Sequence, residues 1–136
     1  MEHEQKNHYS IMFIIMVISG LLSTMNVYAD KIDDIRFSIN DLYMTLLMTG
    51  WMSLFSGIIY KQTNVILIGL ILIIVNIWCI RNQFLITESQ YKLGMIPHHS
   101  MAIHMSKKLL EKQNNITQFL NNLIETQENE IKMLKK

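Results

Sequence analysis

The chain has 136 residues, a formal net charge of +1, and hydrophobic side chains at half of its positions. This length accommodates one small domain rather than two independent ones. The nearly neutral charge creates no field that would attract nucleic acid, so we expect no nucleic-acid partner. The single cysteine, Cys79, excludes an intramolecular disulfide framework and a zinc site built from several cysteines.

Three apolar stretches in the first part of the chain predict membrane-spanning helices. A helix needs about 17–25 mainly apolar residues to cross a bilayer, and the stretches at about 10–29, 42–60 and 64–80 fit this length. Only a few polar residues separate the second stretch from the third, which predicts a tight antiparallel pair. We therefore expect a multi-pass membrane protein in contact with a lipid bilayer. Basic residues fall on both sides of the spans and assign no side to the C-terminal region.

The first apolar stretch has a second interpretation as a cleaved signal peptide. Val27-Tyr28-Ala29, ahead of Asp30, resembles a signal-peptidase site. However, Glu2 and Glu4 outnumber Lys6 before the apolar core, whereas a signal peptide begins with a positively charged segment. We therefore expect that this helix is not cleaved and that the chain crosses the membrane three times. Cleavage would leave two crossings.

The residues beyond the spans predict a polar helix that begins near Glu88. Thr87 followed by Gln90 forms a capping box at its start. Gly94 and Pro97 then interrupt the pattern, since proline lacks an N–H and collides with the preceding helical turn. The sequence leaves two alternatives, a helix that starts anew near Pro97 or a longer helix that bends there.

A second helix follows the predicted turn at residues 113–115. Asn115 and Gln118 repeat the capping pattern, and apolar side chains then recur with helical spacing to the end of the chain. So short a turn predicts antiparallel packing. The predicted fold is therefore all-α, with three transmembrane helices, or two if the first is a cleaved signal, followed by a C-terminal antiparallel helical hairpin. We place the membrane anchor at residues 1–83 and the hairpin domain at 84–136.

Residues 95–105 concentrate the donors that bind soft metals. This segment holds three of the five histidines and three of the eleven methionines of the chain. Imidazole and thioether together suit Cu(I) and other soft metals far better than Mg or Ca, which take oxygen ligands. On a helix Met95, His98 and His99 share one face, and Met105 lies beside it. We therefore expect a soft-metal site on this face.

The second helix of the hairpin brings further donors to the same region. In an antiparallel pair, residues 127–133 return alongside residues 95–99, so Glu130 and Met133 can bind the metal or orient its ligands. The candidate metal ligands are Met95, His98, His99, Met105, His104, Glu130 and Met133.

The histidines also have a less specific interpretation. Adjacent histidines occur at helix starts and on exposed surfaces, and consecutive residues diverge by about 100° around a helix. No serine or cysteine nucleophile in a recognisable setting and no paired carboxylate accompany them, so we expect no enzymatic activity. The alternative function is that of a membrane structural or interaction protein, whose C-terminal hairpin mediates oligomerisation without metal.

The second apolar stretch carries three methionines one helical turn apart, at Met44, Met48 and Met52. They are either flexible apolar filler in a helix core or a path for Cu(I), and we favour the filler. Ser53 and Gly57 form a pair of small residues four positions apart, which would let another helix approach closely.

Two sets of residues resemble a known family of helical proteins. The hairpin carries Met95-Ile96-Pro97-His98-His99, Ala102-Ile103, Met105, Gln127 and Glu130-Ile131. The membrane part carries Tyr43-Met44-Thr45-Leu46-Leu47-Met48, Met52, Tyr60 and Arg81-Asn82-Gln83. Together they resemble the membrane-anchored branch of the domain of unknown function 305 family, whose members are His- and Met-rich helical hairpins associated with copper. The resemblance covers about Leu42 to Leu134, most of the chain.

The resemblance implies a membrane-anchored protein that holds Cu(I) or Ag(I) for sequestration or handover, without catalysis. It implies Met95, His98, His99 and Met105 as the main ligands, with His104, Glu130 and Met133 secondary. The chain departs from the family pattern at Glu88, Tyr91 and His104, and also at its last methionine, which in the family usually falls at the position of Leu134. Here the methionine is Met133, and a shift of one residue turns the thioether by about 100° on a helix.

Overall fold

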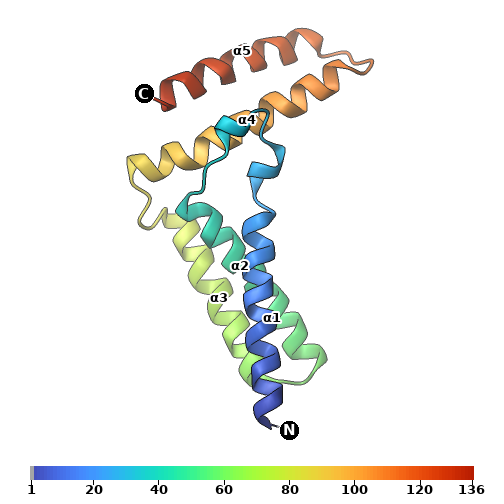
Figure 1. Ribbon diagram of the computed structural model, residues 1–136, viewed down its shortest axis with the longest axis vertical. Helices are drawn as coiled ribbons and strands as arrows, with labels where there is room; N and C mark the ends of the chain where they lie inside the picture. The colour runs from blue at the N-terminus through green and yellow to red at the C-terminus, as the bar shows by residue number, and fades with distance from the viewer. Residues whose placement is uncertain (1) are drawn as a thin grey trace. The chain divides into compact units, whose positions relative to one another are not determined.

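The structure is a computed structural model that describes the backbone of residues 2–136 and the side chains of residues 9–136. Over this range the chain forms five α-helices and two short 3-10 helices (Figure 1). Their bounds are α1 Glu2–Leu22, η1 Met25–Tyr28, η2 Ile32–Asp34, α2 Ile39–Ile59, α3 Thr63–Asn82, α4 Glu88–Leu110 and α5 Thr117–Leu134. The prediction of an all-α fold is confirmed.

Contacts divide the chain into two compact units, neither of which is one continuous stretch of sequence. The first, the span unit, comprises the chain up to Ser23 together with Asn40–Leu85. The second, the hairpin unit, comprises Thr24–Ile39 together with Ile86–Lys136. The predicted boundaries assign residues 24–39 to the anchor, whereas the structure packs this segment with the hairpin. Polar side chains explain the difference, because they join the segment to α4 and to the end of α5.

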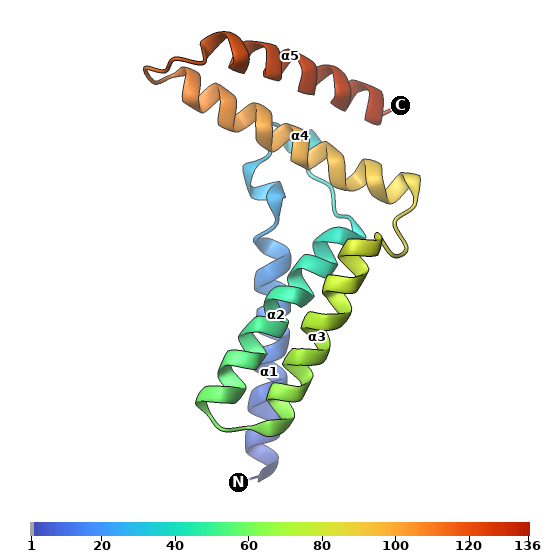
Figure 2. The same cartoon turned by 180° about the vertical axis from the view of Figure 1, so that it is seen from behind.

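In the span unit, α1, α2 and α3 lie side by side, and α2 and α3 run antiparallel (Figures 1 and 2). Three segments are long and apolar enough to cross a membrane, judged by length and composition. They are Tyr9–Tyr28, Ile39–Ile59 and Thr63–Asn82. Each overlaps one of the three spans expected from the sequence.

Glycines let α2 and α3 approach each other closely. A Cβ built at Gly69 would lie 2.6 Å from the backbone nitrogen of Leu54, and one at Gly57 would lie 2.7 Å from that of Ile66. Contacts this short do not occur between real Cβ atoms and backbone, so a larger residue at either position would push the helices apart. The close approach predicted from Ser53 and Gly57 is confirmed, since both residues are buried and Gly57 faces α3.

Two methionines of α2, Met44 and Met52, lie on the outer surface of the span unit, whereas the Met48 side chain reaches Gly20 of α1. Met44, Met48 and Met52 are 58%, 42% and 50% exposed. The expectation that they fill a helix core is therefore wrong for Met44 and Met52. The physical reason is that lipid tails are as apolar as these side chains. In a membrane, methionine side chains that face lipid therefore carry no hydrophobic free-energy cost.

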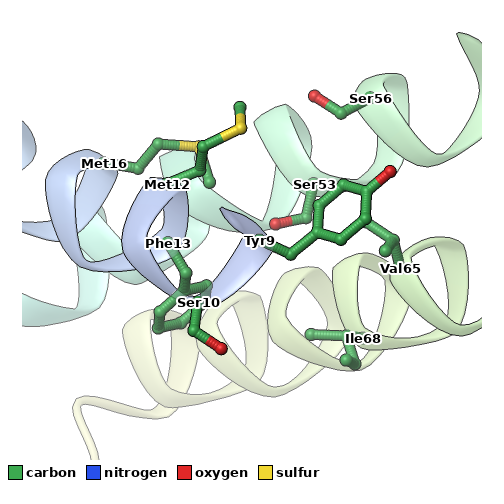
Figure 3. Close-up of a pocket in the computed structure, with 9 residues that line it drawn as sticks. All are labelled: Tyr9, Ser10, Met12, Phe13, Met16, Ser53, Ser56, Val65 and Ile68. Carbon is green, nitrogen blue, oxygen red and sulfur yellow. The ribbon is translucent and has the colours of Figure 1, made fainter. Parts of the chain in front are cut away.

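The span unit contains a partly open pocket of about 170 Å³ to which all three helices contribute (Figure 3). The lining residues are Tyr9, Ser10, Met12, Phe13, Met16, Ser53, Ser56, Val65 and Ile68. None of the predicted metal ligands is among them, so the pocket has no part in the predicted site.

In the hairpin unit, α4 and α5 run antiparallel side by side in both views (Figures 1 and 2). The predicted hairpin is thus confirmed. Its buried apolar core consists of Ile96, Ile103 and Ile131, with Ile124 and Leu134 packed against them.

The first helix of the hairpin, α4, continues without interruption through Pro97. Of the two alternatives left by the sequence, the longer helix is the one that forms. Pro97 is fully buried, so packing around it offsets the backbone hydrogen bond that proline cannot donate. The helix starts as predicted, because the Thr87 hydroxyl accepts a hydrogen bond from the Gln90 N–H at 3.4 Å.

The turn before α5 is capped one residue earlier than predicted. The Asn114 side-chain oxygen accepts hydrogen bonds from the Ile116 N–H and from the Thr117 hydroxyl, both at 3.1 Å. The predicted cap was Asn115, but the residue at the N-cap position is Ile116, whose side chain forms no capping hydrogen bond. The prediction misplaced the cap because two consecutive asparagines have the same local preference for this role.

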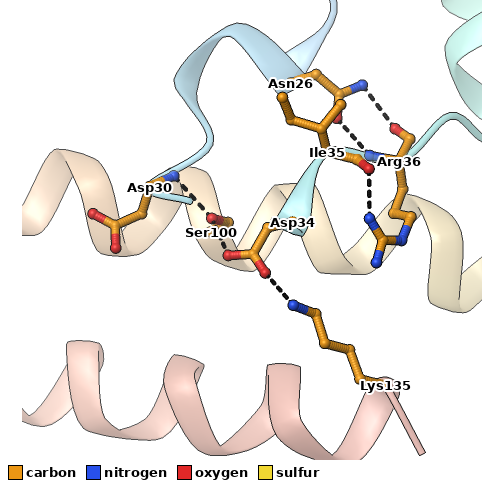
Figure 4. Close-up of polar contacts among 7 residues, drawn as sticks. All are labelled: Asn26, Asp30, Asp34, Ile35, Arg36, Ser100 and Lys135. Carbon is orange, nitrogen blue, oxygen red and sulfur yellow. Dashed lines mark hydrogen bonds and ion pairs between the residues drawn. The ribbon is translucent and has the colours of Figure 1, made fainter. Parts of the chain in front are cut away.

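Buried and partly buried polar contacts hold segment 24–39 on the hairpin (Figure 4). The Ser100 hydroxyl donates to one carboxylate oxygen of Asp34 at 2.7 Å and accepts a hydrogen bond from the Asp30 N–H at 2.9 Å. Lys135, just after α5, donates to the other Asp34 oxygen at 2.6 Å. Lys107 on α4 forms an ion pair with Asp30 at 2.7 Å. One short segment thus contacts α4 and the residue that directly follows α5.

Asp34 is an ionised carboxyl in a buried position, only 2% exposed. Burial by itself would raise the pKa of this carboxyl. The hydrogen bonds from Lys135 and Ser100, together with the positive charges of Lys135 and Lys31, outweigh burial and hold the pKa below its usual value. Asp34 therefore stays charged and keeps its contacts at neutral pH.

Candidate metal centre

A pocket of about 240 Å³ opens between α4 and α5, at the end of the hairpin away from the turn. Four of its six lining residues are predicted metal ligands. The lining residues are Tyr91, Met95, His99, Glu130, Met133 and Leu134. The antiparallel hairpin thus brings together donors that are far apart in the sequence.

Helical spacing explains why these side chains share one pocket. Met95 and His99 are four residues apart on α4, and Glu130 and Met133 are three apart on α5. Residues at these spacings are neighbours on a helix surface, so each pair projects from one face. The isoleucine core beneath the pocket packs α4 and α5 together and so holds the two faces opposite each other.

His99 is the donor whose surroundings are best defined. Its side chain is 12% exposed, and its Nδ1 lies 3.0 Å from a carboxylate oxygen of Glu130. The same nitrogen forms a hydrogen bond with the side-chain amide oxygen of Gln127. Gln127 in turn donates to Glu130 at 3.0 Å. Two residues of α5 therefore orient one imidazole of α4.

Comparison with known proteins relates the chain to a family. The family model of the domain of unknown function (DUF305) matches residues 86–136, which contain α4, α5 and the pocket between them. The chain is also 43% identical over 128 residues to the uncharacterized protein L153 of Acanthamoeba polyphaga mimivirus, over 89% of this chain and 84% of that protein. The chain belongs to the DUF305 family. The resemblance drawn from its sequence is confirmed, and no solved structure matches the chain.

Three predicted ligands of this DUF305 protein are not among the residues that line the pocket, namely His98, His104 and Met105. His98 is exposed, and its ring contacts the His99 ring edge-on, with 5.9 Å between the ring centroids. Met105 is 56% exposed. Successive residues turn by about 100° around a helix, so neighbours in the motif lie on different sides of α4. A ligand role for these three residues stays a prediction.

Two lining residues of the DUF305 pocket were not predicted, Tyr91 and Leu134. Tyr91 lies one helical turn before Met95, and Leu134 lies one helical turn after Glu130, so helical spacing is the signal that predicts both. Met133 and Leu134 both line the pocket. The one-residue shift from the family pattern therefore does not remove the methionine side chain from the pocket.

The donors in this pocket are one imidazole, one carboxylate and two thioethers. Among residues 9–136, no group of three or more His, Cys, Asp or Glu side chains is placed so that it could hold a metal ion. A site in this pocket would therefore use thioether sulfur beside imidazole, which is a donor set that suits Cu(I).

Proposed function

We propose that this DUF305 protein is anchored in a membrane and binds a soft monovalent cation, Cu(I) or Ag(I), in the pocket between α4 and α5. It sequesters the metal or hands it over, and it catalyses no reaction. One observation carries the proposal, namely that Met95, His99 and Met133 line the same pocket.

The donor set supports a soft cation over the commoner metal ions. Mg and Ca take oxygen ligands, and structural zinc prefers cysteine and histidine, so a thioether is a poor ligand for all three. Thioethers also bind without losing a proton, whereas imidazole is protonated in acid and then releases its metal. Two methionines beside one histidine therefore favour Cu(I) or Ag(I) and binding that persists in mild acid.

The order of the spans along the chain is consistent with both parts of the hairpin unit lying on the same side of the membrane. Residues 29–38, which include Asp34, lie between the first and second candidate spans, and residues 86–136 follow the third, so two crossings separate them. If all three helices cross the membrane, both parts lie on the same side, as the ion pair between Lys135 and Asp34 requires. The pocket then belongs to a single compartment, together with the rest of the hairpin unit.

Titration of the full-length protein in detergent micelles with Cu(I), against a chromogenic chelator, tests the proposal. We expect the wild-type protein to compete with the chelator and the Met95→Leu/Met133→Leu double variant to lose this competition. Leucine has a similar volume but no sulfur, so the fold is preserved while the donors are removed. Met101→Leu, which lies outside the pocket lining, is the matched control. A wild-type protein that leaves all Cu(I) with the chelator would refute the proposal.

One observation favours the alternative function, oligomerisation through the hairpin. Ile116 and Phe119, around the start of α5, are 47% and 59% exposed, and exposed apolar groups can mark a contact surface. Under this alternative, Phe119→Ser disrupts oligomers in analytical ultracentrifugation and Cu(I) never binds. Under the metal-binding proposal, Phe119→Ser leaves competition for Cu(I) unchanged.

A further inference from the structure

We propose that Gln127 and Glu130 are positioning residues, which hold His99 in a single tautomer and leave its Nε2 as the nitrogen that binds the metal. The role of Nε2 rests on the function proposed above, whereas the tautomer can be measured without any metal. The sequence leaves two roles open for Glu130, as a metal ligand or as a residue that orients a ligand, and the inference assigns the second.

The orientation of the Gln127 side chain follows from its contact with Glu130. An ionised carboxylate accepts hydrogen bonds and cannot donate them. The Gln127 atom that lies 3.0 Å from the Glu130 carboxylate must therefore be the amide nitrogen. The amide oxygen then faces His99, where it forms the hydrogen bond with Nδ1.

The proton of the neutral His99 ring must reside on Nδ1. This nitrogen faces two acceptors, the Gln127 amide oxygen and the Glu130 carboxylate oxygen. A nitrogen that carried a lone pair would be repelled by both oxygens, whereas an N–H can donate to them. In a neutral imidazole only one nitrogen carries a proton, so the lone pair lies on Nε2.

The arrangement leaves Nε2 of His99 available to a ligand. Both partners from α5 bind Nδ1, and the ring lines the pocket beside Met95 and Met133. Metal-binding histidines commonly donate their second N–H to a carboxylate or carbonyl oxygen, which fixes the ring and increases its basicity. Such partners are worth about 10–100-fold in metal affinity.

Nuclear magnetic resonance of the full-length protein in micelles, with histidine labelled by nitrogen-15, measures the tautomer directly. Above about pH 8, where imidazole is neutral, long-range hydrogen–nitrogen correlations distinguish a proton on Nδ1 from one on Nε2. The His99→Asn variant assigns the signals, and the exposed His98 is an internal reference. We expect His99 without metal to carry its proton on Nδ1. A proton on Nε2 would overturn the inference, whether or not the protein binds metal.

Substitution of the two positioning residues tests the consequence for metal binding. In Gln127→Ala/Glu130→Ala we expect the His99 tautomer to become mixed and the affinity for Ag(I) to fall by about 10–100-fold. Glu130→Gln keeps an acceptor oxygen and should retain the tautomer and most of the affinity. Glu125→Ala, at an exposed position on the same helix, is the matched control and should change neither.

The two proposals fail in different ways. Loss of Ag(I) affinity in Glu130→Gln with an unchanged tautomer would mean that Glu130 is a ligand, and would overturn the positioning role. A wild-type protein with the proton on Nδ1 but no affinity for Ag(I) would refute the proposed function, and with it the role of Nε2 as a metal ligand.

Discussion

Lys135 and Asp34 are separated by 101 residues, and the ammonium group of one donates to the carboxylate of the other at 2.6 Å. Asp34 belongs to the segment between the first two candidate spans, and Lys135 directly follows the last helix. The same carboxylate accepts a hydrogen bond from Ser100 on α4. One buried side chain thus joins three separate parts of the chain into the hairpin unit.

Replacing Asp34 with asparagine should destabilise the hairpin unit. The variant keeps the shape of the side chain but loses the charge that pairs with Lys135, and a hydrogen bond to a charged group is worth about 1.5–3 kcal/mol. Because Lys135 is partly exposed and can turn toward water, we expect a loss of about 1–3 kcal/mol rather than the larger cost of a fully buried unpaired charge. Hydrogen exchange of the full-length protein in micelles should accelerate in α4 and α5. Asp33→Asn, at an exposed neighbour, should leave exchange unchanged.

The stabilisation from Asp34 should depend on pH in a defined direction. Its pKa in the folded protein is lowered below the usual value of 3.8, chiefly because hydrogen bonds from Lys135 and Ser100 outweigh burial. A carboxyl with a lowered folded pKa stabilises the fold fully above its unfolded pKa, and this contribution disappears as pH falls through the folded pKa. The stability difference between wild type and Asp34→Asn should therefore be constant from about pH 5 to 7 and shrink below about pH 4. A difference that grows in acid would contradict this account.

Met133→Leu should weaken Cu(I) binding more than Met105→Leu. Both are exposed methionines that the sequence marks as ligands, but only Met133 lines the pocket with His99. Removing a residue that only orients a metal ligand typically lowers metal affinity by about 10–100-fold. Loss of a ligand itself should therefore lower the affinity by at least about tenfold. Competition with a chromogenic chelator measures both variants. Equal losses would show that the site extends to the outer side of α4.

Gly69→Ala should destabilise the span unit. The added methyl group would lie 2.6 Å from the Leu54 nitrogen and 2.9 Å from the Gly50 carbonyl oxygen, and neither backbone atom can move independently of its helix. Overpacking of this kind costs about 1–3 kcal/mol. Thermal unfolding in micelles should shift to lower temperature. Ile71→Ala, at a position 61% exposed on the same helix, should cause a smaller shift.

Features that depend on neighbouring residues were predictable from the sequence. The three apolar stretches, the Thr87 cap and the antiparallel hairpin follow from composition, spacing and a short turn, and the structure contains all of them. The meeting of Met95 and His99 with Met133 was likewise predicted, because the short turn dictates which ends of the two helices face each other.

Features that depend on tertiary packing were not predictable in the same way. Nothing in the local sequence distinguishes Asp34 from the exposed Asp33 beside it, so the assignment of residues 24–39 to the hairpin unit required the fold. The separation of His98 and Met105 from the pocket depends on which side of α4 faces α5. That rotation is set by packing of the isoleucine core, which the motif alone does not reveal.

X-ray absorption at the copper edge of the full-length protein loaded with Cu(I) tests the central claim most directly. The account predicts sulfur from thioethers together with one imidazole nitrogen around the metal, and loss of the sulfur signal in Met95→Leu/Met133→Leu. Copper surrounded only by nitrogen and oxygen, or a sulfur signal unchanged in the double variant, would contradict the assignment of the pocket between α4 and α5 as the metal site.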